Sequence, residues 1–209
     1  KLMHIYEIFE KPLIKILAFM EIEGIKLDDK FLKKLSLKFE KKINLLENNI
    51  YKISKKKFNI ASTKQLGEIM YNELKIASLK KTKKGSFATS ANVLEDLAFK
   101  GHHLPKLVLE WRQATKLKNT YTDSLQEHIN PKTKRVHTSF LLAATTTGRL
   151  ASSDPNLQNI PIKSEEGRDI RKAFISEKNK NLISADYNQI EMRILSDLAD
   201  VKELKKAFK

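Results

Sequence analysis

Residues 181–185 form a short apolar run that ends in Asp186, and a helical pattern begins just after it. A run of this length predicts a buried strand that delivers the Asp186 carboxylate at its carboxyl end. Carboxylate oxygens are the ligands that hard cations such as Mg²⁺ prefer. A strand end also fixes the oxygen while leaving room for a substrate. Aspartate at a strand end is, however, more often a helix N-cap than a metal ligand, and position alone leaves both interpretations open.

A second polar segment lies upstream. Residues 145–153 gather small hydroxylated residues around Gly148 and Arg149, and residues 154–161 place Asn156 and Gln158 between two prolines. Ordinary loops are also rich in such residues. Small residues nevertheless allow a ligand backbone to approach closely, and Arg, Asn and Gln are the side chains that bind acceptors in a DNA minor groove.

A helical pattern from Pro105 to about Leu125 carries a third candidate site. Pro105 suits the first turn of a helix. Arg112, Lys116 and Asn119 follow one another at steps of four and three residues, and therefore share one face. Two cations and an amide would suit a DNA backbone, although a solvated helix face has the same pattern. The opposite face is apolar and predicts core packing through Leu107, Val108, Trp111, Ala114, Tyr121 and Leu125.

The rest of the first half also indicates helices. One is expected up to Glu23 and Gly24, and a long one from Asp28 to about Ile53 with a narrow seam suited to an antiparallel neighbour. Ser62 and Gln65 fit a capping box. Ser90 caps another short helix. Residues 80–86 are expected to form a basic, turn-prone loop. The loop is either solvated or binds the phosphates of a nucleic-acid backbone.

The pattern changes near Pro131. Residues 135–140 alternate as in a strand, so that a helical amino-terminal region is expected to lead into a mixed α/β region.

The composition of the 209 residues is that of a globular protein, with 41% hydrophobic and 31% charged residues. No apolar stretch is long enough to span a membrane, and cysteine is absent, which favours an intracellular location. The net charge of +15 favours a polyanionic partner. Lysine bias from an AT-rich genome would give a similar charge. The arginines are more informative because their forked donors suit phosphates and base edges, and they occur only at Arg112, Arg135, Arg149, Arg168, Arg171 and Arg193.

The segment Asp-Tyr-Asn-Gln-Ile-Glu-Met-Arg, residues 186–193, resembles motif A of family A DNA polymerases, usually Asp-Tyr-Ser-Gln-Ile-Glu-Leu-Arg. Residues 147–150 and 155–161 are similar to the palm segment just upstream of that motif. Residues 62–66 and 116–121 are similar to thumb sequences of bacterial members. The resemblance covers essentially the whole chain in the family's order.

This resemblance implies an α/β (α+β) fold, part of a right-hand polymerase domain. Residues 1–27 would be an entry helix packing on the palm, and residues 28–130 a helical, duplex-binding thumb. Residues 131–187 would be the amino-terminal palm, with a mainly antiparallel sheet and the motif A strand, and residues 188–209 a helix leading toward the fingers.

The resemblance also implies a DNA-directed DNA polymerase that uses two Mg²⁺ ions, with primer–template DNA and deoxynucleoside triphosphates as partners and the bacterial cytoplasm and nucleoid as its location. Asp186 and the Tyr187 carbonyl would be metal ligands. Gln189, Ile190 and Glu191 would line the nucleotide site, and Glu191 would exclude a ribose 2′ hydroxyl. Arg149 would contact the minor groove of the primer-terminal pair, with Asn156 and Gln158 along the same groove. Arg112, Lys116 and Asn119 would hold the DNA backbone.

Several departures limit the resemblance. Asn188 and Met192 replace the usual Ser and Leu, and Lys163 stands where Arg is usual, so that a bidentate contact is not expected there. The first residue is not Met, which suggests an excised fragment. The fingers helix and the segment with the second catalytic aspartate do not occur in these 209 residues, and we expect the chain alone not to polymerise DNA.

A non-catalytic DNA clamp is the main alternative function, and a lysine-rich membrane-surface protein is a weaker one.

Overall fold

The computed structural model describes residues 2–76 and 87–208 of the chain. The basic loop expected at residues 80–86 lies outside these ranges. The chain divides into two compact units, Lys1–Ile175 and Ser176–Lys209. None of the helices formed by the described residues combines the length and the apolar character needed to cross a bilayer.

The first unit begins with a continuous helical segment made of α1 (Leu2–Ile5), the π-helical stretch η1 (Tyr6–Glu10) and α2 (Lys11–Glu23). The segment ends as expected at Gly24, which has a φ of 61°. Its carboxyl end contacts the rest of the unit, where His137 donates from Nδ1 to the carbonyl oxygen of Glu21 at 2.8 Å. Most of its apolar side chains are exposed, including Ile22 at 77%.

The long helix expected from Asp28 is α3 (Asp29–Ser54). The Asp28 side chain caps it by accepting from the Phe31 backbone nitrogen at 2.9 Å, and the helix ends at Lys55 in the left-handed region, with a φ of 56°. The expected seam is buried at Leu32, Leu35, Phe39, Leu46 and Ile50. Burial of each such side chain contributes roughly 1.5–3 kcal/mol.

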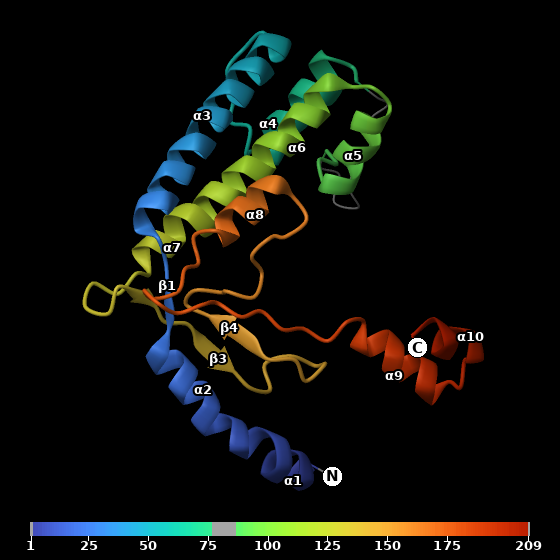
Figure 1. Cartoon of the computed structure of the whole chain (residues 1–209). Coiled ribbons are helices and arrows are strands. Elements are labelled where there is room, and N and C mark those ends of the chain that lie inside the picture. Colours follow the sequence, from blue (N-terminus) through green and yellow to red (C-terminus); the bar gives the residue numbers. More distant parts are fainter. Residues whose placement is uncertain (1, 77–86, 209) are drawn as a thin grey trace. The chain divides into compact units, whose positions relative to one another are not determined.

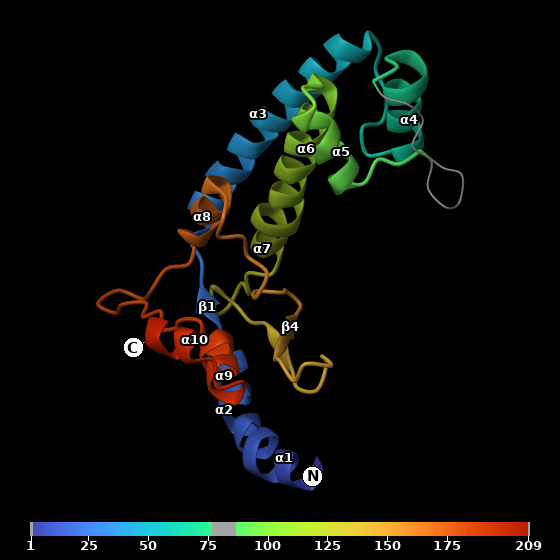
Figure 2. The ribbon, with the colours of Figure 1, turned by 90° about the vertical axis from the view of Figure 1, so that its right-hand side faces the viewer.

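The antiparallel neighbour of α3 is a second continuous helical segment, made of α6 (His103–Lys116), η3 (Leu117–Asp123) and α7 (Ser124–Glu127). Both views show α3 and α6 side by side and running in opposite directions (Figures 1 and 2). The other elements of the helical region are α4 (Thr63–Gly67), η2 (Glu68–Glu73) and α5 (Ala91–Phe99).

Two hydrophobic cores lie at opposite ends of α3. One packs Ile50 with residues of α4, η2, α5 and α6, including Leu66, Leu94 and Val108. The other packs Leu32 and Phe39 with residues of η3, α7, β2 and α8, including Tyr121 and Ile170. Because α3 and the α6–α7 segment contribute to both cores, they hold the two ends of the unit together.

The described residues of the first unit also form two short antiparallel ladders. Strand β1 (Ile25–Lys26) pairs with β2 (Arg135–Val136), and β3 (Ser139–Leu141) pairs with β4 (Ala151–Ser153). The strand expected at residues 135–140 is therefore divided between two ladders. Thr138 lies at the break and donates from Oγ1 to the carbonyl oxygens of Ser153 and Pro155, at 3.0 and 2.8 Å. Helix α8 (Glu165–Arg171) completes the unit.

The second unit contains helices α9 (Ile190–Leu198) and α10 (Lys202–Ala207). The strand expected at residues 181–185 does not form, and these residues are exposed and irregular. A buried strand is stabilised by hydrogen bonds to neighbouring strands and by cover on its faces. No strand among the described residues pairs with this run, which is the physical reason for the difference.

Candidate nucleic-acid interface

Arg112, Lys116 and Asn119 line one cavity of about 810 Å³ in the first unit. The expected shared face on the α6–η3 segment is therefore present. The opposite wall comes from residues 87–90 and from the start of α4. The full lining is Ala61, Thr63, Phe87, Thr89, Ser90, Trp111, Arg112, Thr115, Lys116, Asn119 and Thr120.

The Arg112 guanidinium is fixed in orientation. Its NH1 donates to the carbonyl oxygen of Thr89 at 2.7 Å. Burial lowers the pKa of Arg112 below its ordinary value, but an arginine remains protonated at neutral pH. The side chain is thus a half-buried positive charge whose remaining donors are available at the cavity.

Residues 87–90 are in turn held by Tyr71 of η2. The Tyr71 hydroxyl donates to the carbonyl oxygen of Ala88 at 2.7 Å, and its ring stacks on Phe87 with centroids 5.5 Å apart and planes 21° apart. Burial raises the pKa of the Tyr71 hydroxyl, which therefore stays a donor at neutral pH. The wall opposite Arg112 is consequently built on a packed aromatic pair.

The chemistry of the cavity suits an anion. Among the described residues that line it none is acidic, whereas Arg112 and Lys116 are cationic. Hydroxyl and amide donors from Thr63, Ser90 and Asn119 add to them. Thr115 Oγ1 is buried without a hydrogen-bond partner among the described residues. Cations and neutral donors without carboxylates form the arrangement that binds phosphate groups.

The second expected region, around Arg149, is a turn followed by β4. Gly148 has a φ of 72° and open space around it, and Thr145 Oγ1 closes the turn by donating to the carbonyl oxygen of Arg149 at 2.8 Å. Arg149, Asn156 and Gln158 are all exposed. Gln158 donates from Nε2 to the carbonyl oxygen of Leu150 at 3.0 Å, so part of its amide already supports the loop.

Asn156 organises the same loop. Its Oδ1 accepts from the Gln158 backbone nitrogen at 3.0 Å, and Ser152 Oγ accepts from the Leu157 nitrogen at 3.1 Å. The following residues are tied to η3, where the Tyr121 hydroxyl donates to the carbonyl oxygen of Asn159. The structure therefore connects the Arg149 loop to the α6–η3 segment within the first unit.

Asp186 lies in the second unit, in an exposed stretch that precedes α9. Tyr187 is 81% exposed, and Gln189, with a φ of 51°, stands at the start of α9. Glu191 lies in the first turn of that helix, where its negative charge interacts favourably with the positive end of the helix dipole. Arg193 stabilises the unit by donating from Nε to the carbonyl oxygen of Asn188 at 2.9 Å and by lying over the Phe208 ring at 4.9 Å.

The fit of Asp186 to a magnesium ion is partial. Its exposed carboxylate is the oxygen ligand that Mg²⁺ prefers. Across residues 2–76 and 87–208, however, no group of three or more His, Asp or Glu side chains is arranged to hold a metal ion. The described residues therefore supply one candidate ligand and do not form a complete metal site.

The cavity on α6 includes residues that the sequence interpretation did not single out for binding, above all Thr89, Ser90 and Thr115. Ser90 was expected only as a helix cap. It precedes α5 but makes no side-chain capping bond. The Ser90 hydroxyl is therefore not used to cap α5, and the sequence alone did not indicate that it lines the cavity.

Comparison with known proteins settles the family. A model of the family described as DNA polymerase family A matches residues 29–209. The chain belongs to DNA polymerase family A. The expectation drawn from residues 186–193 and from the upstream segments is thereby confirmed.

Curated family A relatives agree. The chain is 52% identical to a DNA polymerase I of Rhizobium leguminosarum over 98% of this chain and 20% of the relative. It is 44% identical to a thermostable DNA polymerase I of Thermus thermophilus over 100% of this chain and 25% of the relative. The chain thus spans about a fifth to a quarter of the length of these relatives.

A solved polymerase-domain structure is similar in fold. It is described as the POL domain of Pol1 from M. smegmatis in complex with a DNA primer-template and dNTP. The TM-score is 0.88 at 41% identity, over 95% of this chain and 35% of that chain. The expected fold class, an α/β (α+β) part of a right-hand polymerase domain, is confirmed, and the chain is mostly helical with small antiparallel sheets.

Proposed function

We propose that this chain is the thumb and the first part of the palm of a DNA-directed DNA polymerase, which adds deoxynucleotides to a primer 3′ end during replication and repair. The observation that carries the proposal is the similarity to a polymerase domain whose structure holds primer-template DNA and dNTP. Residues 28–130 would form the thumb and residues 131–187 the palm. Residues 1–27 would be the entry helix, and residues 188–209 would lead toward the fingers.

The cavity on α6 is the proposed contact with the DNA backbone. Arg112, Lys116 and Asn119 would bind phosphate oxygens, with Thr89 fixing the direction of the guanidinium. Phosphate contacts of this kind hold a duplex in register without selecting its sequence. That property suits a polymerase, which must move along any template.

The loop around Arg149 is the proposed contact with the minor groove. There, purine N3 and pyrimidine O2 present acceptors for every base pair. Arg149 would donate to these acceptors at the primer-terminal pair, and the exposed Asn156 and Gln158 would extend the contact. Such a contact responds to the shape of a base pair and not to its identity.

In the second unit, Asp186 and the Tyr187 carbonyl are the proposed ligands for magnesium, and Gln189, Ile190 and Glu191 the proposed nucleotide-binding residues. In the full-length protein, two Mg²⁺ ions would activate the primer hydroxyl and stabilise charge on the departing pyrophosphate. Asp186 would supply one carboxylate ligand of that site. Further ligands must come from outside the described residues. With DNA as its partner, the protein would lie with the chromosome in the bacterial cytoplasm.

The proposal is tested in the full-length protein with Asp186→Asn, which keeps the shape of the side chain but removes its charge. We expect primer extension to fall by about a thousandfold or more, because the carboxylate is a metal ligand, while affinity for primer–template DNA stays within about twofold. Asp197→Asn is the control, because Asp197 is an exposed carboxylate of the same unit that forms an ion pair with Lys205.

Unchanged extension by Asp186→Asn would refute the role given to this residue and would favour a non-catalytic DNA clamp. The same assay applies to the 209 residues alone. We expect no extension above background, because the described residues contain no complete metal site. Primer extension by the purified 209-residue chain would contradict the proposal that Asp186 needs further metal ligands from outside the described residues.

A further inference from the structure

A second cavity of the first unit, about 490 Å³ in volume, lies between α3 and α8. Its lining is Phe31, Lys34, Leu35, Leu37, Lys38, Lys41, Asp169 and Lys172, and we call this cavity the lysine groove. No residue lines both the lysine groove and the cavity on α6. In Figure 2, α8 and α4 lie on opposite sides of α6. The proposed DNA contacts leave the lysine groove without a function.

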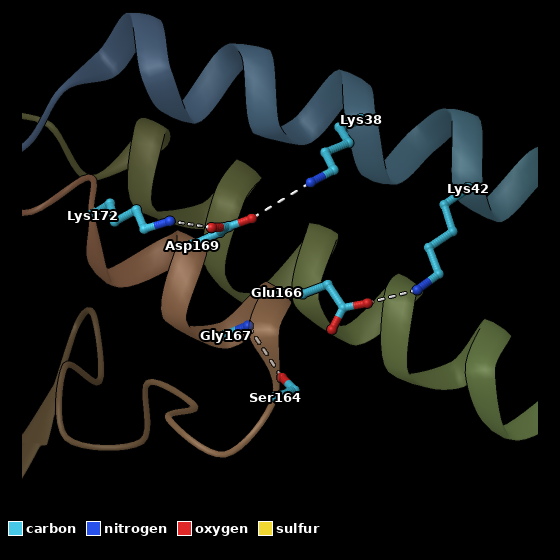
Figure 3. A network of polar contacts seen from close by, with 7 residues as sticks. All are labelled: Lys38, Lys42, Ser164, Glu166, Gly167, Asp169 and Lys172. Atoms are coloured by element: carbon cyan, nitrogen blue, oxygen red, sulfur yellow. Dashed lines mark hydrogen bonds and ion pairs between the residues drawn. The ribbon is translucent and has the colours of Figure 1, made fainter.

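Ion pairs hold the two walls of the lysine groove together (Figure 3). Lys42 of α3 contacts Glu166 of α8 at 2.7 Å, and Asp169 of α8 contacts Lys38 at 3.5 Å and Lys172 at 2.7 Å. The hydrogen bond from Lys172 lowers the pKa of the Asp169 carboxyl. The hydrogen bond from Lys42 lowers the pKa of Glu166 in the same way.

The α8 wall is also fixed at its start. The Ser164 side chain caps the helix by accepting from the Gly167 backbone nitrogen at 3.1 Å (Figure 3). Gly167 has no room for a side chain, since a Cβ there would lie 2.6 Å from Pro161 Cβ. The lysine groove is therefore preformed, which lowers the entropic cost of binding a partner.

The charge of the lysine groove points to an anionic partner. Four lysines and one aspartate line it, so that its formal charge is +3. Lys38 and Lys172 are engaged by Asp169. Lys34 and Lys41 are exposed and form no hydrogen bond or ion pair with the described residues. These two ammonium groups are available to carboxylates of a partner.

The floor of the lysine groove distinguishes between kinds of anion. It is apolar, with buried Leu35, half-buried Phe31 and Leu37, which is 58% exposed. Nucleic-acid backbones offer nothing to cover a leucine, and the lining has none of the hydroxyl and amide donors found in the cavity on α6. An apolar floor with lysines at its edge matches an acidic segment that also carries an apolar side chain.

We propose that the lysine groove is a docking site for a short acidic peptide segment of a partner protein. One apolar side chain of the segment covers Leu37 and Leu35, and flanking carboxylates pair with Lys34 and Lys41. Docking here would join a partner to the polymerase on a surface that the proposed DNA contacts do not use. The inference stands on the groove alone, so that it can be tested without DNA.

The probe is a fluorescein-labelled eight-residue peptide in which three Glu and three Asp flank a central Leu-Phe pair. It is titrated with the full-length protein, and binding is measured by fluorescence anisotropy. We expect a Kd on the order of 10 µM, typical of a small interface with few anchors. Replacing Leu-Phe by Ser-Ser, or the acidic residues by their amides, should each weaken binding by at least about fivefold.

Two matched pairs of variants locate the site. Lys34→Gln with Lys41→Gln should weaken binding by about fivefold or more, since two ion pairs are lost. Lys52→Gln with Lys106→Gln, which removes two exposed lysines outside the groove, should change it by less than about twofold. Leu37→Ser should weaken binding by about threefold, and Leu45→Ser, at a leucine of α3 with 61% exposure, should leave it unchanged.

Photo-crosslinking to the unsubstituted protein provides a readout that no folding defect can affect. A benzophenone on the peptide should label residues of α3 or α8 that line the lysine groove. Labelling elsewhere, equal losses in both lysine pairs, equal binding of the neutral peptide, or full displacement of the peptide by a twelve-nucleotide single strand would each overturn the proposal. The last result would assign the groove to nucleic acid.

Discussion

Arg112 shows how a single residue acquires a defined role from its contacts. One of its donors is committed to the carbonyl oxygen of Thr89 at 2.7 Å, and its half-buried position limits the directions in which the others can point. Lys116, one turn later, is exposed and has no such restraint. The two cations should therefore contribute differently, with Arg112 setting geometry and Lys116 adding a flexible charge.

Asp123 is the residue that couples α3 to the end of η3, because its carboxylate accepts from Ser36 of α3 and from Lys118 at 2.6 Å. Burial by itself would raise the pKa of Asp123, but the hydrogen bonds from Lys118, Ser36 and Thr122 and the charge of Lys118 lower it overall. The stabilisation is thus present above the unfolded-state pKa of about 4 and is lost as the pH falls through the lower folded-state value.

We predict that Asp123→Asn lowers the free energy of unfolding by about 1 kcal/mol at pH 7, since a charge-assisted hydrogen bond at a partly exposed site is lost. The difference should shrink as the pH falls below about 4, where the native carboxylate begins to protonate. Urea unfolding followed by circular dichroism at several pH values measures both effects. Glu7→Gln, which removes an exposed i,i+4 pair with Lys11, should cost less than about 0.5 kcal/mol. A pH-independent loss would contradict the coupling.

At the scale of elements, α4 illustrates a packing constraint that the sequence does not reveal. Gly67 lies at the end of α4 and is buried, and a Cβ placed there would lie 2.3 Å from the Cβ of Phe87. Glycine to alanine in an ordinary helix position stabilises by about 1 kcal/mol. Here the close approach of two backbones requires glycine, because the clash involves a Cβ that cannot rotate away.

We predict that Gly67→Ala lowers the free energy of unfolding by roughly 1–3 kcal/mol, the usual cost of overpacking. Because Phe87 stacks on Tyr71 and lines the cavity on α6, its displacement should also weaken duplex binding. Urea unfolding and a duplex titration of the same variant measure the two effects. A stabilised variant with unchanged duplex affinity would contradict the role of this contact.

The elements also show which features a sequence can predict. Helix α3 was predictable because a local cap at Asp28 and a regular apolar seam act together within one segment. Strand β1 was not, because its two residues pair with Val136 and Arg135, more than a hundred positions away. The run at residues 181–185 has the composition of a strand but no pairing partner among the described residues, and composition alone does not supply one.

The candidate site also has residues that the sequence predicts and residues that it does not. The shared face of Arg112, Lys116 and Asn119 follows from helical spacing, and the structure brings all three to one cavity. Thr89 and Ser90 could not be assigned to it, because the path of residues 87–90 across α6 depends on the packing of Tyr71. Asp186 was singled out through its motif, and its metal-binding role stays a prediction.

For the molecule as a whole, the two units divide the proposed work. The first unit has two cores, a donor-lined cavity and the lysine groove, and would hold DNA and a protein partner. The second unit contains Asp186 and the proposed nucleotide-binding residues. Binding of DNA should therefore be a property of the first unit that survives the loss of catalysis.

Duplex binding by the 209-residue chain tests this account most directly. We expect anisotropy of a labelled 20-base-pair duplex to give an affinity that falls steeply between about 50 and 300 mM KCl, as phosphate contacts require. Arg112→Ala with Lys116→Ala should weaken binding by about tenfold or more and reduce the slope of log Kd against log salt by about 2. Lys34→Gln with Lys41→Gln, outside the cavity on α6, should leave the slope unchanged. Equal slopes for the unsubstituted chain and the Arg112–Lys116 variant would contradict the proposed DNA interface.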